Sequence, residues 1–200
     1  MRPVLAVLLV ALLAACANDG GVDSSPAEVA AASFTTEGPR TLTLFTMISN
    51  RTGSGGHTAL MIDGSQRVIF DPAGSFRDPR VAERGDVIYG ITPAWLQAYR
   101  SAHARSAYHV VSQRIVVTPE QAEQALRLAQ SNGSVMAAHC ANATSRLLAQ
   151  VPGFTHVDRT YYPVKLMTQF GTIQGVETTR YYEDDAGNVI DALQAAQATQ

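Results

Sequence analysis

Polar and apolar residues alternate along residues 41–48, where the sequence reads TLTLFTMI. A period of two places successive side chains on opposite faces, so this stretch predicts a β-strand. A loop rich in Gly and Ser follows over residues 50–56. Two further short runs, at residues 57–62 and 67–70, flank the turn signal Asp63-Gly64. We therefore expect three antiparallel strands at the start of the fold.

Helical spacing and helix caps appear in the second half of the chain. Thr92-Pro93 and Thr118-Pro119 each place a capping hydroxyl before a proline that suits the first helical turn. Gln121 completes a capping box at the second of these sites. The other expected elements are a short strand at 87–89, helix 94–104, strand 108–117, a helix ending at 131–133, a helix from Cys140 to about residue 152, and a helix introduced by residues 160–163 that continues to about residue 170. The mixture predicts an α+β fold.

Two registers of the first hairpin compete. With a two-residue turn at Asp63-Gly64, His57 lies opposite Phe70 and both faces mix polar with apolar residues. With a three-residue connection over residues 63–65, His57 lies opposite Asp71 and one face becomes apolar. Burial favours the second register, although Asp-Gly suits the shorter turn. This register also sets a carboxylate beside an imidazole, which fixes the histidine tautomer in a catalytic triad.

The N-terminus has the pattern of a secretory signal, with Arg2 followed by an uncharged apolar run over residues 4–15. The run is too short to cross about 30 Å of hydrocarbon as a helix. Its end, Leu13-Ala14-Ala15-Cys16, resembles the bacterial lipobox, in which the cysteine is acylated and becomes the first mature residue. An ordinary signal peptide is the alternative. The small residues beside Cys16 favour a lipoprotein signal peptide over residues 1–15.

Acylation of Cys16 predicts a stable membrane anchor, because several acyl chains bind more firmly than one, at about 0.8 kcal/mol per buried methylene. Ala17, rather than aspartate, follows the cysteine, which in lipoproteins usually accompanies sorting to the outer membrane. We expect a bacterial cell-envelope protein, anchored in the outer membrane and facing the periplasm. Residues 16–40 should form the lipidated cysteine and a flexible tether. The domain should span residues 41–185, and residues 186–200 should form a C-terminal tail.

The charge of the mature chain argues against a nucleic-acid partner. Removal of residues 1–15 leaves 14 Lys and Arg against 17 Asp and Glu, a formal charge of −3. The sequence contains no basic run, no low-complexity tract and no internal repeat. One globular domain is the natural interpretation.

Cys140 is the only thiol that remains once Cys16 is acylated. At a helix N-terminus and near an imidazolium, a thiol pKa of about 8.5 falls by one or more units, which would make Cys140 a nucleophile. A buried inert cysteine is the alternative. Exported cysteines are usually paired, so a retained lone thiol favours reactivity. Because His139 is a poor N-cap, the helix could instead begin at Ser134.

His57 is the candidate base, because it follows two glycines at the mouth of a strand, where a substrate or a helix could approach; the alternative is a surface histidine. Asp71 is the candidate orienting group, although Asp-Pro-Ala-Gly is also a plain turn in which aspartate caps the backbone. A second cysteine that could resolve a mixed disulfide is absent, which disfavours a thiol redox protein.

The other histidines and tyrosines carry weaker expectations. His139, beside the candidate nucleophile, makes a poor zinc site without further ligands, and we expect no metal or other cofactor. His103 and His109 have no partner that the sequence reveals. Tyr161 and Tyr162 are expected to pack against the last helix rather than to donate to an oxyanion.

The segments Gly55-Gly56-His57-Thr58-Ala59-Leu60 and His139-Cys140-Ala141, with the strand that ends at Asp71, together resemble the circularly permuted branch of NlpC-type papain-like cysteine hydrolases. In that branch the histidine precedes the cysteine. The resemblance covers roughly residues 41–170. It implies a permuted papain-like α+β fold, in which an antiparallel sheet packs against the helix that carries the cysteine. It also implies Cys140 as nucleophile, His57 as general base and Asp71 as orienting group, with no cofactor.

The activity implied by the resemblance is acyl transfer through a thioester. The family includes cell-wall amidases and endopeptidases, and also lipid acyltransferases related to lecithin retinol acyltransferase. For an outer-membrane protein facing the periplasm, peptidoglycan peptides are the first expected substrate, and lipid or lipoprotein acyl groups are the second. The alternative from another class is a non-catalytic envelope lipoprotein that holds a peptide or protein partner and keeps Cys140 as a core residue.

Overall fold

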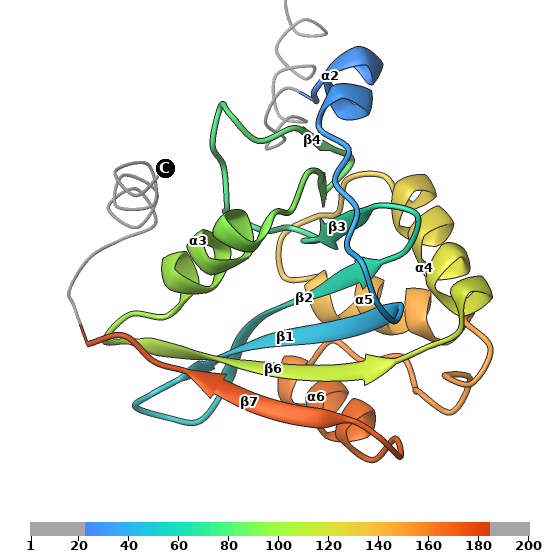
Figure 1. Cartoon of the computed structure of the whole chain (residues 1–200). Coiled ribbons are helices and arrows are strands. Elements are labelled where there is room, and N and C mark those ends of the chain that lie inside the picture. Colours follow the sequence, from blue (N-terminus) through green and yellow to red (C-terminus); the bar gives the residue numbers. More distant parts are fainter. Residues whose placement is uncertain (1–22, 185–200) are drawn as a thin grey trace, which may run out of the picture.

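The computed structural model describes residues 23–184, and this part of the chain forms a mixed α+β fold. Its seven strands form one antiparallel sheet in the order β4-β5-β3-β2-β1-β6-β7 (Figure 1). The strands are β1 (Thr41–Ser49), β2 (Gly55–Asp63), β3 (Arg67–Phe70), β4 (Glu83–Arg84), β5 (Val87–Ile88), β6 (Tyr108–Val116) and β7 (Glu177–Tyr181). The helices are α2 (Pro26–Ala31), α3 (Pro93–His103), α4 (Pro119–Asn132), α5 (Cys140–Leu148) and α6 (Pro163–Gly171). The expected α+β class and antiparallel sheet are confirmed.

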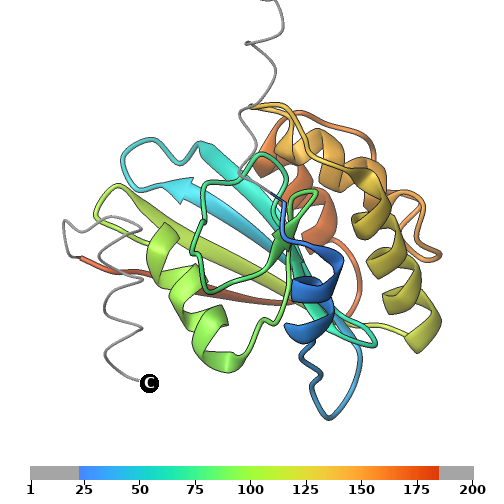
Figure 2. The same cartoon turned by 90° about the horizontal axis from the view of Figure 1, so that it is seen from above.

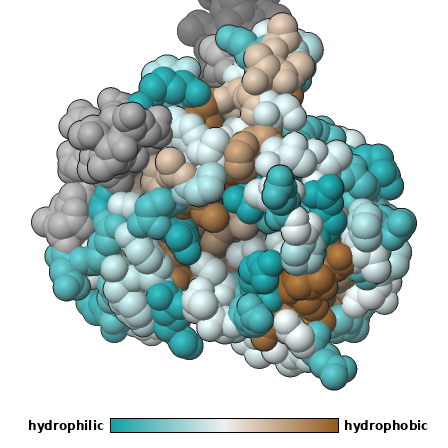
Figure 3. All heavy atoms as spheres, in the orientation of Figure 1, coloured by the Kyte–Doolittle hydropathy of each residue, from teal (hydrophilic) through white to brown (hydrophobic). Residues whose placement is uncertain are grey.

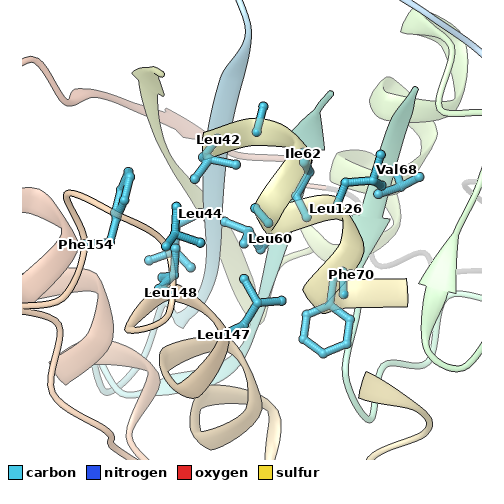
Figure 4. Close-up of a cluster of buried hydrophobic side chains, with 14 of the residues drawn as sticks. Leu42, Leu44, Leu60, Ile62, Val68, Phe70, Leu126, Leu147, Leu148 and Phe154 are labelled. Atoms are coloured by element: carbon cyan, nitrogen blue, oxygen red, sulfur yellow. The ribbon is translucent and has the colours of Figure 1, made fainter. Parts of the chain in front are cut away.

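Helices cover both faces of the sheet, with α4, α5 and α6 on one side and α3 on the other (Figure 2). On the first side, Leu44 and Leu60 belong to the larger core cluster, which Figure 4 shows between the strands and the helices. On the second side, Phe45 and Met61 share a cluster with Tyr99 of α3. The central strands β1 and β2 are therefore buried on both faces, which holds their ends in fixed positions between two helical layers.

The β2–β3 hairpin has a different register from the one favoured by its sequence. Asp63 pairs with Arg67, so the loop consists of residues 64–66, and His57 does not lie directly opposite Asp71. The predicted pairing is therefore wrong. The shift is an even number of residues, however, and an even shift leaves every side chain on its own face. The predicted division into faces is confirmed, and it keeps His57 and Asp71 on the same side of the sheet.

Buried hydrogen bonds explain why Asp63 stays in the strand instead of entering the turn. Its carboxylate accepts hydrogen bonds from Thr41 Oγ1 at 2.8 Å and from Arg67 Nε at 2.5 Å. The loop itself is held to α4, because the backbone N–H of Ser65 donates to the Glu123 carboxylate. Thr41 and Glu123 come from other segments of the chain, so the local preference of Asp-Gly for a two-residue turn does not decide the register by itself.

Both predicted helix caps are confirmed. The Thr92 hydroxyl accepts a hydrogen bond from the backbone N–H of Trp95 at the start of α3. Thr118 and Gln121 form the complete capping box at the start of α4, and that helix ends at Gly133. These signals are local, because each cap depends on residues within one helical turn.

Strand β7 was not predicted from the sequence. It pairs with β6 at the edge of the sheet, and its side chains are mostly exposed, so it lacks the apolar alternation that marks a half-buried strand. The molecular surface in this view is mostly hydrophilic, and its largest hydrophobic patch lies near the end of β6 (Figure 3). Pairing with β6, rather than side-chain burial, defines this strand.

Residues 23–40 belong to the fold, so the expectation of a flexible tether over residues 16–40 is wrong for this part. The backbone N–H of Ser24 donates to the Glu83 carbonyl at 2.7 Å, which ties the segment to β4. Helix α2 and the residue after it place Val29 and Ala32 against the main core cluster. Small apolar side chains are enough to hold this segment, because it packs on a surface that the rest of the fold already forms. The composition of the segment alone does not reveal that surface.

The signal peptide expected over residues 1–15, the lipidated Cys16 and the tail expected over residues 186–200 lie outside the described residues. Within residues 23–184, no helix combines the length and the apolar character needed to cross a membrane. The anchor and its membrane therefore stay predictions from the sequence.

Candidate active site

Cys140, His57 and Asp71 come together from three different elements. Cys140 is the first residue of α5, His57 lies in β2, and Asp71 directly follows β3. His57 Nε2 lies 2.7 Å from Asp71 Oδ1, and the Cys140 thiol is close enough to the same imidazole for the two groups to shift each other's pKa. Because Nε2 faces the carboxylate, Nδ1 is the ring nitrogen available to the thiol. The three residues selected from the sequence are thus in contact.

The environment of Cys140 favours its thiolate. The residue is only 6% exposed, and this burial alone would raise the pKa of the thiol. The hydrogen bond and charge of His57, together with the backbone N–H groups of Thr58 and Ala141, outweigh burial and lower the pKa of Cys140 below its ordinary value. Stabilisation by an imidazolium and by a helix N-terminus is the pattern of a reactive cysteine.

His57 has the complementary shift. Burial acts to lower the pKa of its imidazole, but the charge and hydrogen bond of Asp71, with smaller contributions from Cys140, raise this pKa to about 10. A lowered thiol pKa next to a raised imidazole pKa means that the proton resides on His57. The two shifts together favour the thiolate–imidazolium pair over a neutral thiol beside a neutral imidazole.

Asp71 is completely buried, yet it remains a carboxylate. Burial acts to raise the pKa of the Asp71 carboxyl, and the charge and hydrogen bond of His57, aided by His103 and Tyr99, lower it instead. Its Oδ1 accepts hydrogen bonds from His57 Nε2 at 2.7 Å and from the Tyr99 hydroxyl at 2.8 Å. One of these donors is charged and the other is neutral, and together they hold the buried carboxylate in a fixed orientation toward the imidazole.

Tyr99 is a site residue that the sequence analysis missed. It lies in α3, is completely buried, and donates its hydroxyl hydrogen to Asp71 from the side of the sheet opposite α5. Phe45 and Phe76 pack against its ring, with centroids 5.6 Å and 5.2 Å away. The only sequence signal was an aromatic residue on the apolar side of a helix, which by itself indicates packing.

Replacing Tyr99 with phenylalanine should lower the free energy of unfolding by about 1.5 to 3 kcal/mol, because a buried carboxylate loses one of its two donors. Urea denaturation, followed by fluorescence, measures this change. Tyr162→Phe is the matched control, since that ring is 72% exposed and its hydroxyl is expected to contribute little. Equal stability of the two variants would show that Tyr99 only fills space.

His103, for which the sequence revealed no partner, also belongs to this environment. Its ring lies 6.1 Å from the His57 ring at an angle of 14°, and its Nδ1 donates to the Tyr99 carbonyl at 2.8 Å. Burial is the main reason that the pKa of His103 is lowered, so the ring is neutral. A neutral ring beside the His57 imidazolium adds no repelling charge.

The two glycines before His57 make room for other parts of the chain. A Cβ at Gly55 would lie 2.7 Å from Pro163 Cβ at the start of α6, and one at Gly56 would lie 2.7 Å from the Tyr108 ring. The space that the sequence analysis assigned to a substrate or a helix is thus taken by α6 and by an aromatic ring. These contacts fix the position at which β2 presents His57.

Asp86 braces the two segments that carry Asp71 and Cys140. The backbone N–H of Asp71 donates to the Asp86 carbonyl at 2.8 Å. Asp86 Oδ2 accepts from the N–H groups of Ala73 at 2.9 Å and Val135 at 2.8 Å. The loop after β3 and the segment before α5 therefore share one buried carboxylate, which couples their positions.

The remaining candidate residues lie outside this cluster. His139 Nδ1 donates to the Ala137 carbonyl at 2.9 Å, and its ring meets Tyr161 edge-on at 5.3 Å. Tyr161 and Tyr162 are 54% and 72% exposed, so neither ring belongs to the buried core. Among the described residues, no three His, Cys, Asp or Glu side chains form a group that could hold a metal ion.

Comparisons with protein-family models, with curated proteins and with solved structures return no match to this chain.

Proposed function

We propose that this protein is a lipid-anchored cysteine hydrolase of the cell envelope with a permuted papain-like fold. The observation that carries the proposal is a contiguous series of groups: the Cys140 thiol interacts with the His57 imidazole, and both His57 and Tyr99 are hydrogen-bonded to Asp71. An inert core cysteine needs no imidazole and no buried carboxylate beside it, and burying such charges is costly. The series has the connectivity of nucleophile, base and orienting group.

Acylation begins with attack of the Cys140 thiolate on the carbonyl carbon of an amide. A sulfur–carbon bond forms, and the carbonyl oxygen becomes an oxyanion. The His57 imidazolium then gives its Nδ1 proton to the amine nitrogen as the carbon–nitrogen bond breaks. The amine leaves, the acyl group remains on Cys140 as a thioester, and His57 is neutral.

Hydrolysis of the thioester restores the starting state. Neutral His57 takes a proton from a water molecule, whose oxygen adds to the thioester carbon. When the carbon–sulfur bond breaks, the acid is released and the thiolate–imidazolium pair forms again. Asp71 keeps its negative charge throughout, so it supports the imidazolium in both halves of the cycle.

The N-terminus of α5 supplies the first candidate for stabilising the oxyanion. Cys140 is the first helical residue, so its backbone N–H belongs to the first turn, whose N–H groups have no acceptor within the helix. This donor and the reacting sulfur belong to the same residue, so the N–H lies close to the carbon that the sulfur attacks. Helix N-termini also favour developing negative charge.

The first substrate candidate is an amide in the peptides of peptidoglycan, and the second is a lipid or lipoprotein acyl group. Both follow from the resemblance to NlpC-type hydrolases and from the expected anchor at Cys16. An amidase or endopeptidase needs the protonated His57 to release an amine, which matches the raised pKa of this imidazole.

The test is turnover of matched substrates by the detergent-solubilised protein. We expect cleavage of peptidoglycan stem peptides, with at least about a 1,000-fold loss in Cys140→Ala. Mass spectrometry would detect both the products and an acyl group on Cys140. Thermal unfolding of Cys140→Ala must match that of the unaltered chain, so that inactivity reports chemistry rather than misfolding.

A non-catalytic binding protein is the second candidate, favoured by the low exposure of Cys140. It predicts neither turnover nor an acyl–Cys140 adduct with peptides or with acyl esters. Turnover of acyl esters alone would instead assign the protein to lipid acyl chemistry.

A further inference from the structure

An open pocket of about 190 Å³ lies beside Cys140 on the outward side of α5. The end of α4, the segment of residues 133–139 and the first two turns of α5 form its walls. The side chains that define its character are those of Asn132, Ser134, Met136, His139, Asn142 and Arg146. The acyl-transfer mechanism above uses none of them.

Helical spacing explains why this pocket adjoins the nucleophile without containing it. His139, Asn142 and Arg146 follow one another at intervals of three and four residues, so they share one side of α5. Cys140 points instead toward His57 on β2. His139 lines the pocket and immediately precedes Cys140, so the pocket adjoins the N-terminus of α5, where the reacting residue lies.

The pocket offers positive charge and hydrogen-bond donors. No carboxylate is among its lining side chains, and Arg146 is the cation. Arg146 Nη2 donates to Asn132 Oδ1 at 2.6 Å, which holds the guanidinium at the wall. A guanidinium has five N–H donors and pairs well with a planar carboxylate, and the Asn142 amide and Ser134 hydroxyl can add further donors.

Apolar surface borders these polar groups. Met136 lines the pocket and is 73% exposed, and the Tyr161 ring stands against His139 at the rim. Large exposed apolar side chains around a polar pocket suit a ligand that has both a charged group and aliphatic parts. A peptide with a free carboxylate has this character.

We propose that the pocket binds a free carboxylate of a peptide whose acyl carbon is presented to Cys140. The inference rests on the proposed function and specifies its substrate class. Arg146 follows Cys140 by six residues, about 9 Å along the helix axis, and its side chain tilts back toward the helix N-terminus. At about 3.5 Å per extended residue, the carboxylate lies two to three residues from the scissile carbonyl.

A single guanidinium favours a carboxylate over a phosphate. A phosphate carries up to two negative charges and three acceptor oxygens, and its sites usually gather several cations. This pocket provides one arginine and no lysine. The carboxylate of a peptide therefore fits it better than a phospholipid headgroup.

The binding test uses NMR on Cys140→Ala, so that it does not depend on catalysis. Acetyl-Gly-Gly as the free acid should shift the Asn142 side-chain and Ala143 backbone amide signals, with at least about fivefold tighter binding than acetyl-Gly-Gly amide. Arg146→Gln should remove this preference. Arg127→Gln, which removes an exposed arginine of α4 outside the pocket, should retain it.

Three outcomes would overturn the carboxylate site. They are equal binding of acid and amide, an equal loss of preference in both arginine variants, and tighter binding of glycerol 3-phosphate than of the acid. A companion measurement compares alkylation of Cys140 by bromoacetyl-Gly-Gly acid and by its amide. In both reactions the Cys140 sulfur forms a bond to the bromoacetyl carbon, the carbon–bromine bond breaks, and bromide leaves. A thiol inert to both reagents would count against the hydrolase, while the NMR result would still decide the pocket.

Discussion

Alkylation of Cys140 at pH 6 should slow by about 10- to 100-fold when His57 is replaced by alanine, because each unit of thiol pKa changes the thiolate fraction about tenfold. In the unaltered protein, the hydrogen bond and charge of His57 offset burial and lower the pKa of Cys140. Without the imidazole, the effect of burial is less fully offset, so this pKa should rise. The thiolate, which is the reacting form, then appears only at higher pH.

The direction of the pH dependence follows from the two shifts. With His57 present, the midpoint of the alkylation profile should lie below 9.0, the ordinary thiol pKa. Above that midpoint the rate should stay high up to pH 10, because loss of the imidazolium proton, for which the pKa is about 10, leaves the thiol ionised. In His57→Ala the midpoint should move to higher pH.

The measurement is the rate of iodoacetamide labelling of the detergent-solubilised protein between pH 5 and pH 10, with mass spectrometry to assign the label to Cys140. His156→Ala is the matched control, because His156 is exposed and lies in the connection between α5 and α6. Identical profiles for His57→Ala and the unaltered protein would refute activation by His57 and favour the binding-protein alternative.

Replacing Gly74 with alanine should destabilise the fold by about 2 to 4 kcal/mol and also disturb the site. A Cβ at this position would lie 1.8 Å from Asp71 Oδ2, far inside van der Waals contact. Gly74 does not adopt a positive φ, so the penalty comes from this contact rather than from the backbone. Because Asp71 is completely buried, the carboxylate can yield only by distorting its bond to His57.

Urea denaturation measures the stability of Gly74→Ala, and iodoacetamide labelling measures its thiol. Ser75→Ala is the neighbouring control, since Ser75 is exposed. In the double variant Asp71→Ala with Gly74→Ala, the clash is gone. The free energy of unfolding should therefore fall by less than the sum of the losses in the two single variants. Thiol activation should still be low, because the imidazole has lost its carboxylate. Simple additivity would mean that Gly74 and Asp71 do not interact.

The contact between His57 and Asp71 illustrates how much a strand pattern can predict. The alternation of residues 57–70 assigned both side chains to one face, and the structure keeps them there. The pairing itself was wrong, because the register depends on the bonds of Asp63 to Thr41 and Arg67. A side chain's face needs only the period of the strand, whereas its exact partner needs contacts across the sheet.

The sequence by itself determined the local features of this protein: the capped starts of α3 and α4, the faces of the hairpin, and the choice of Cys140, His57 and Asp71 as candidates. These depend on neighbours within a few residues along the chain. Tyr99, the Asp86 brace, strand β7 and the packing of residues 23–40 were decided by the tertiary structure alone. Each depends on a surface or a donor supplied by a distant segment, and one-dimensional spacing carries no signal of such a partner.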